Sequence, residues 1–162
     1  MRFYLFIFLL FSIASCVQPP EYSNTPTLEF RGFSKDVMRQ GSIGQDSVTL
    51  VLYFTDGDGD FGSKGDDPTT NVFLLDKRTN QTFREYKAPF IPEEGAGNGI
   101  SGTMSIKVLT TCCVYSQASG IPPCERSLEF PTNDLIFDIF ITDRSGNKSN
   151  VVTTTPIKLS CI

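Results

Sequence analysis

Three aspartates alternate with glycine directly after an apolar run. The segment "VTLVLYFTDGDGDFG" covers residues 48–62 and carries Asp56, Asp58 and Asp60. Carboxylates packed this closely repel one another and raise each other's pKa values, and a divalent cation removes that conflict. Calcium takes about six to eight hard oxygen ligands, so the spacing predicts a calcium-binding loop. The alternative is a solvated polar turn without metal, because Asp-Gly pairs are frequent in tight turns.

A second loop, "TDRSGNKS", also starts with Thr-Asp after an apolar run, and it carries Asp143 and Asn147. If the two runs are the second and sixth strands of an immunoglobulin-like sandwich, the loops that follow them lie at the same end of it. We therefore expect Asp143 and Asn147 to join the aspartates. Read alone, Ser-Gly-Asn in this loop is a good hairpin connection without any ligand role.

The aspartate spacing resembles the D-x-D-x-D-G calcium loop of EF-hands, and this resemblance implies that the three aspartates are ligands. Two features depart from the pattern. Phe61 stands where the pattern has glycine, and the preceding run is strand-like, so no helix–loop–helix unit forms. Counted from Asp56, the twelfth position is Asp67, where the pattern has a bidentate glutamate, and Asp67 is therefore a further candidate ligand.

Short apolar runs bounded by turn residues must position these loops. No segment keeps a helical period for three turns, and seven runs are typical of strands. Together they predict an all-β fold, an immunoglobulin- or fibronectin-like antiparallel β-sandwich of about seven strands. Runs 47–54 and 135–142 are apolar on both faces and should be central. The runs cover residues 27–33, 47–54, 71–76, 81–86, 101–109, 135–142 and 150–159.

The first residues indicate export. Arg2 precedes the apolar run "FYLFIFLLF", which is too short to span a membrane, and small residues lead to Cys16. The residues 13–16, "IASC", resemble a bacterial lipobox, which implies a signal peptide over 1–15 and lipidation of Cys16. An ordinary secretory signal is the alternative. The proline-rich residues 16–26 suit a flexible tether, so the sandwich domain is expected over 27–162.

Four further cysteines suit an oxidising compartment: Cys112, Cys113, Cys124 and Cys161. Adjacent cysteines rarely bridge each other, which leaves two pairings. Strand parity places Cys112 and Cys161 on the core side, which favours Cys112–Cys161 with Cys113–Cys124; this argument does not hold if Thr110 or Thr111 begins a bulge. Neither zinc binding nor a catalytic cysteine is expected, because the chain has no CxxC pair and no histidine.

The composition argues against several classes of function. A net charge of −4 disfavours nucleic acid as a partner, and the lack of histidine removes Ser-His-Asp and Cys-His catalysis. A carboxylate-based hydrolase is a remote alternative, with Glu93, Glu94 or Asp138 as its acids. We expect no enzyme. A binding module for a protein or glycan is a second hypothesis, through loop residues that are unusually apolar, namely Phe90, Ile91, Tyr115 and Ile121.

Three motifs together resemble a group of short exported bacterial lipoproteins without established activity: "FTDGDGDFG", the "CC" pair and "DRSGNKSN". The resemblance implies a lipid-anchored protein of the bacterial cell envelope with an immunoglobulin-like domain. The absence of an acidic cluster after Cys16 favours the periplasmic side of a membrane over the cell surface. We expect a structural or adhesion role for a calcium-braced sandwich beside its tether.

Overall fold

The structure, a computed structural model, describes residues 21–41, 44–92 and 99–162. The expected signal peptide, Cys16 and the first part of the tether lie outside the described residues, as do Glu93 and Glu94. Within the described ranges the fold is all-β, and its one helical element is a 3-10 turn, η2, at Gln117–Ser119. The predicted all-β class is therefore confirmed.

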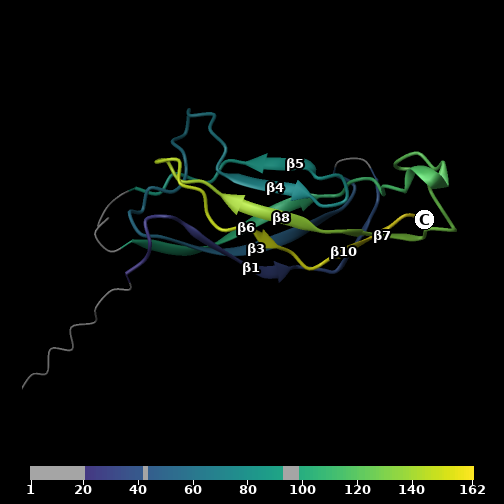
Figure 1. Cartoon of the computed structure of the whole chain (residues 1–162), viewed down its shortest axis with the longest axis horizontal. Coiled ribbons are helices and arrows are strands. Elements are labelled where there is room, and N and C mark those ends of the chain that lie inside the picture. Colours follow the sequence, from purple (N-terminus) through teal and green to yellow (C-terminus); the bar gives the residue numbers. More distant parts are fainter. Residues whose placement is uncertain (1–20, 42–43, 93–98) are drawn as a thin grey trace, which may run out of the picture.

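The strands form three sheets that stack into an elongated body, an arrangement compatible with a β-sandwich (Figure 1). The first sheet has the order β1-β3-β6, with β1 at Thr27–Phe33, β3 at Ser47–Asp56 and β6 at Ile100–Leu109. The second has the order β5-β4-β8-β9, with β5 at Gln81–Tyr86, β4 at Val72–Asp76, β8 at Phe137–Ile141 and β9 at Val152–Thr153. In the third, β10 at Ile157–Ser160 lies between β2 at Val37–Arg39 and β7 at Thr132–Leu135.

Two central strands were predicted, and both occupy interior positions. β3 pairs with β1 and β6, and β8 pairs with β4 and β9. The described residues contain ten strands rather than about seven, because two predicted runs are interrupted and β2 was not foreseen. Residues 132–141 form β7 and β8 with a break at Ile136, and residues 152–160 form β9 and β10 with Pro156 between them. Proline cannot donate a ladder hydrogen bond, which fits the second break.

The core lies between the sheets and is filled from alternate positions of the central strands. In β3, burial alternates along the whole strand, so Val48, Leu50, Leu52 and Phe54 face inward. In β8, the inward residues are Phe137, Ile139 and Ile141, all without exposed surface. Alternation of this kind fixes the register of both strands, because a shift by one residue would turn the apolar side chains outward.

The long axis of the body separates two poles (Figure 1). At what we call the proximal pole, β1 begins and β3 ends, since Thr27 pairs with Thr55 and Asp56 with Ile100. At the distal pole, β3 begins opposite Leu109 at the end of β6. Ten residues of extended strand separate the poles by about 30 Å.

Both disulfides lie at the distal pole, and they join Cys112 to Cys124 and Cys113 to Cys161. The predicted pairs Cys112–Cys161 and Cys113–Cys124 are therefore wrong. The parity argument fails because β6 ends at Leu109, after which the chain is irregular. After Leu109 the buried residues are Thr110 and Cys113, which are three positions apart instead of two. Cys113 therefore faces the core in place of Cys112.

A buried ion pair stabilises the same pole. Arg78 Nη2 lies 2.6 Å from Asp76 Oδ2, and the two side chains are only 10% and 7% exposed. Arg78 Nε donates to the same carboxylate, at 3.0 Å to Oδ1 and 3.1 Å to Oδ2, and Nη1 donates to the carbonyl oxygen of Cys112 at 3.0 Å and to Asn133 Oδ1 at 2.6 Å. This network links the β4–β5 turn to the first disulfide and to β7.

Candidate metal centre

Four carboxylates meet at the proximal pole: Asp56, Asp58, Asp60 and Asp143. One oxygen from each lies within 4.8 Å of one oxygen of every other, and we call these four residues the carboxylate cluster. Asp56 is fully buried, whereas Asp60 and Asp143 are 8% and 5% exposed. A cluster of this kind could hold a metal ion, because a cation neutralises the repulsion between buried carboxylates.

Asp56 and Asp143 point into the core because each continues the row of alternate residues with which its strand faces inward. Asp56 is the last residue of β3 and stands two positions after Phe54, so its side chain continues the inward row. Asp143 stands two positions after Ile141 and extends the inward row of β8 in the same way. Both carboxylates are therefore directed into the end of the core, where an apolar side chain would be expected.

Several carboxylate oxygens of the cluster have no hydrogen-bond partner although they are buried. They are both oxygens of Asp56 and the Oδ1 atoms of Asp58 and Asp60. A buried charge without a partner costs free energy, and buried polar groups in folded proteins are generally satisfied. Burial raises the pKa of Asp56 to about 7, with further contributions from Asp58 and from the charges of Asp60 and Asp143. These are the properties of an oxygen-rich cation site.

Other groups from the second loop hold two of the carboxylates in place. Asp60 Oδ2 accepts hydrogen bonds from the backbone nitrogen of Ser145 at 2.9 Å and from its hydroxyl at 2.7 Å. Asn147 donates its backbone N–H to Asp143 Oδ1 at 2.7 Å and its side-chain amide to Asp143 Oδ2 at 2.9 Å. Asn147 was predicted as a ligand, and in the structure it orients the carboxylate of Asp143 through these two bonds.

Phe61 explains how the loop differs from the EF-hand spacing. Its side chain is buried against Phe54, with the ring centroids 4.8 Å apart, so the loop is anchored in the core immediately after Asp60. The turn follows at Gly62, whose φ of +83° favours glycine. A Cβ atom at this position would lie 1.9 Å from the carbonyl oxygen of Pro89, so no larger residue fits.

Arg144, which belongs to the second loop, forms hydrogen bonds to the loop that carries Asp58 and Asp60. Its Nη1 donates to the carbonyl oxygens of Phe61 at 3.0 Å and Gly62 at 3.1 Å. Its guanidinium carbon also lies 4.7 Å from the centre of the Phe90 ring. Sequence reasoning did not assign a role to Arg144, and the signal that could have found it is its position directly after Asp143.

The remaining predicted site residues are not members of the carboxylate cluster. Asp67 is exposed, and hydrogen bonds from Thr69 hold the pKa of its carboxyl below the usual value. Ile91 and Tyr115 pack against the core, and the Tyr115 hydroxyl donates to the carbonyl oxygen of Glu125 at 2.6 Å. Phe90 and Ile121 are half-buried at separate places in the fold. Phe90 and Ile91 lie beside the loop that carries Asp60, through Arg144 and through the hydrogen bond from Ile91 to the carbonyl oxygen of Phe61, whereas Tyr115 and Ile121 lie elsewhere.

The segment before β1 lies against the carboxylate cluster. Gly57, the residue after Asp56, donates its N–H to the carbonyl oxygen of Ser23 at 2.8 Å. A Cβ atom on Gly57 would come within 2.3 Å of the carbonyl oxygen of Tyr22, so the two backbones are in direct contact. The part of the expected tether that the structure describes therefore runs beside the residue that follows Asp56.

Comparisons with known proteins add no functional assignment. No family model matches this sequence, no match is found among the curated proteins, and no solved structure matches. In the part of the chain that the structure describes, no helix has the length and apolar character needed to cross a membrane.

Proposed function

We propose that this protein is a non-catalytic, lipid-anchored lipoprotein of the bacterial cell envelope whose β-sandwich is braced by calcium where the tether enters it. Its role in this proposal is structural or adhesive. The observation that carries it is the set of four buried carboxylate oxygens without hydrogen-bond partners on Asp56, Asp58 and Asp60. Asp143, from the opposite central strand, completes the ligand set.

The chemistry of the donors favours calcium over softer metals. All members of the carboxylate cluster are hard oxygen donors, and the four cysteines of the domain are paired in disulfides. Oxygens on opposite sides of one calcium ion are about 4.6 to 5.2 Å apart, which agrees with a cluster whose oxygens lie within 4.8 Å of one another. Asp56 has both oxygens free and could bind through the pair, with water completing the shell.

The bracing role follows from the position of the carboxylate cluster between two sheets. Asp56 ends β3 in one sheet and Asp143 follows β8 in another, so an ion bound to both would cross-link the sheets at the proximal pole. The hydrogen bond from Gly57 to Ser23 would extend the braced region to the base of the tether. The envelope location and the lipid anchor rest on the resemblance of residues 13–16 to a lipobox.

Calorimetric titration with calcium tests the proposal. The chain from residue 17 to 162 contains every described strand, and we expect it to bind calcium saturably and to melt at a higher temperature when calcium is present. Asp58→Ala/Asp60→Ala should abolish both effects. Asp67→Asn is the matched control, because Asp67 lies outside the carboxylate cluster, and it should bind calcium like the wild type. Absence of heat and of a thermal shift in the wild type would refute the calcium brace.

Lipidation has a separate test. In a bacterial expression host, the full-length chain should incorporate labelled palmitate and partition with membranes, and Cys16→Ser should do neither. A Cys16→Ser variant that still incorporates label would show that Cys16 is not the acylated residue.

A further inference from the structure

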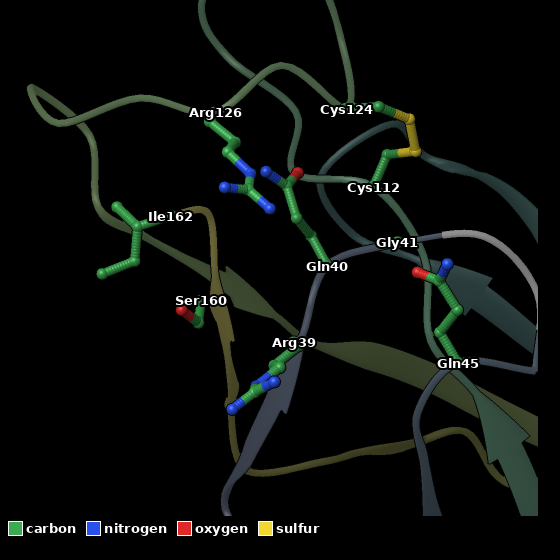
Figure 2. Close-up of a pocket in the computed structure, with 9 residues that line it drawn as sticks. All are labelled: Arg39, Gln40, Gly41, Gln45, Cys112, Cys124, Arg126, Ser160 and Ile162. Carbon is green, nitrogen blue, oxygen red and sulfur yellow. A yellow bond between two sulfur atoms is a disulfide. The ribbon is translucent and has the colours of Figure 1, made fainter.

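A hollow at the distal pole, beside the Cys112–Cys124 disulfide, has a volume of about 740 Å³. We call it the distal pocket; its walls include Arg39, Gln40, Cys112, Arg126, Ser160 and Ile162 (Figure 2). Cavities of about 300 to 1,000 Å³ are the usual size for ligand sites in proteins. The distal pocket lies at the opposite end of the body from the carboxylate cluster, so the two sites are independent.

The floor of the distal pocket is held by specific bonds. Gln40 donates its side-chain amide to the carbonyl oxygens of Glu125 at 3.0 Å and Cys161 at 2.9 Å, and its Oε1 accepts from the backbone nitrogen of Cys113 at 3.1 Å. The disulfide between Cys112 and Cys124 forms one side of the hollow (Figure 2). A ligand would therefore meet a preformed surface, which lowers the entropic cost of binding.

Two arginines line the distal pocket. Arg126 extends into the hollow from one rim, and Arg39 lies on the other rim beside its strand partner Ser160 (Figure 2). Among the described residues, neither guanidinium makes an ion pair or a hydrogen bond, whereas Arg31 and Arg78 are each paired with a carboxylate. Unpaired guanidinium groups in a chain of net charge −4 are suited to a carboxylate of a binding partner.

Exposed apolar side chains adjoin these charges. Leu128 is 91% exposed and Ile162 is 60% exposed. Both line a smaller hollow of about 250 Å³ that shares Arg126 and Ile162 with the distal pocket, so the two hollows adjoin each other. A lone exposed leucine is ordinary, but apolar groups beside unpaired cations at the edge of a cavity are typical of a surface that binds another molecule.

We propose that the distal pocket and its apolar rim bind an extended peptide segment of a partner protein. The segment carries an aspartate or glutamate whose carboxylate contacts Arg39 and Arg126, next to an apolar side chain that packs on Leu128 and Ile162. The apolar contacts here are aliphatic, and this favours a peptide over a glycan, which is commonly held on the faces of aromatic rings. The site does not depend on calcium.

Selection from a random twelve-residue peptide display library tests this assignment. The target is the chain from residue 17 to 162, immobilised through its N-terminus, with Arg39→Ser/Arg126→Ser as the counter-selection. We expect enriched peptides to carry Asp or Glu adjacent to Leu, Ile, Val, Met or Phe. A synthetic copy of such a peptide should lose about tenfold or more in affinity on the double variant, and similarly when its own acidic residue is replaced by the amide.

Matched variants separate binding from folding. Arg39, Arg126 and Leu128 are exposed, so Arg39→Ser/Arg126→Ser and Leu128→Ser should melt like the wild type while binding the peptide more weakly. Arg31→Ser, which removes an exposed arginine paired with Glu29 on β1, should bind the peptide normally. No enrichment over the counter-selected variant, or enriched peptides without acidic residues, would overturn the proposal. So would binding of heparin, as a probe for an anionic glycan, without any binding of peptide.

Discussion

Gly57 and Ser23 are joined by a backbone hydrogen bond of 2.8 Å, which places the segment before β1 directly beside the last residue of β3. The contact exists because Gly57 has no side chain: a Cβ atom there would overlap the carbonyl oxygen of Tyr22. One peptide unit therefore separates Asp56 from the contact with the start of the domain.

Gly57→Ala should separate the two segments. We expect the free energy of unfolding to fall by about 1 to 3 kcal/mol, because the new methyl group must displace the Tyr22 backbone. The amide of residue 57 should also lose its protection from hydrogen exchange. Gly65→Ala is the control, since a Cβ atom on Gly65 meets nothing within 4 Å. Equal stability of the two variants would show that the Tyr22–Gly57 contact is unimportant.

The stability of the metal-free domain should fall as the pH rises from about 4 to about 7. The pKa of Asp56 is raised from 3.8 to about 7, so over this range the folded state holds a proton that the unfolded state has lost. Stability then decreases by up to about 1.4 kcal/mol per pH unit. Urea unfolding at a series of pH values, in the presence of a chelator, measures this slope.

Asp56→Asn supplies the control for the pH series. The amide cannot ionise, so the slope should flatten and the metal-free variant should be more stable than the wild type at pH 7, although it no longer binds calcium well. Saturating calcium should also remove the slope in the wild type, because the ion takes the place of the proton. A wild type whose stability rises from about pH 4 to about pH 7 without metal would contradict the raised pKa of Asp56.

The two disulfides should differ in their contribution to stability and in their reactivity. Chain-entropy estimates give about 3 kcal/mol for the loop closed by Cys112 and Cys124 and about 4 kcal/mol for the longer one closed by Cys113 and Cys161. Cys113 and Cys161 are fully buried, whereas Cys124 is exposed, so mild reduction should open the Cys112–Cys124 bond first.

Partial reduction followed by alkylation and mass spectrometry identifies the first bond to open. Trypsin leaves Cys112, Cys113 and Cys124 on one peptide, so fragmentation within that peptide must locate the two labels. Labels on Cys112 and Cys124 are expected. Labels on Cys113 and Cys124 would support the pairing that the parity of β6 had suggested.

Arg78→Met should destabilise the domain by about 3 to 5 kcal/mol, because it leaves the buried carboxylate of Asp76 without its partner. Arg31→Met removes an exposed ion pair with Glu29 and should cost less than about 1 kcal/mol. Denaturant unfolding of both variants measures the difference. Similar losses in the two would mean that the Arg78–Asp76 pair is effectively solvated.

Much of the fold could be predicted from the local pattern of apolar residues in the sequence. The alternation of apolar residues over 47–54 predicted β3 and its central place, since burial of one face specifies a strand's register. The same alternation, continued by two residues, places Asp56 and Asp143 inside the core. The expected topology put the loops after these two strands at one end of the sandwich, and on that ground the sequence predicted that the two carboxylates meet, although they are 87 positions apart (143 − 56).

Other features depend on contacts that no local pattern encodes. The disulfide pairing depends on the irregular backbone after Leu109, where the alternation of a strand no longer predicts which residues face the core. Asp67 was predicted as a ligand from the EF-hand spacing. That spacing does not apply after Asp60, because Phe61 enters the core and redirects the chain. The distal pocket joins residues from β2, β10 and the segment after β6, and its arginines carry no sequence signal of their own.

The parallel pairing of β2 with β10 and the antiparallel pairing of β1 with β3 determine how the domain would respond to mechanical load. A pull on the segment before Thr27, opposed by a partner held at the distal end, would act along the strand axes. The hydrogen bonds of both pairs would then be loaded in shear, together, and not peeled apart one by one. Such a geometry would resist tension along the body better than one in which the ends are drawn from the same side.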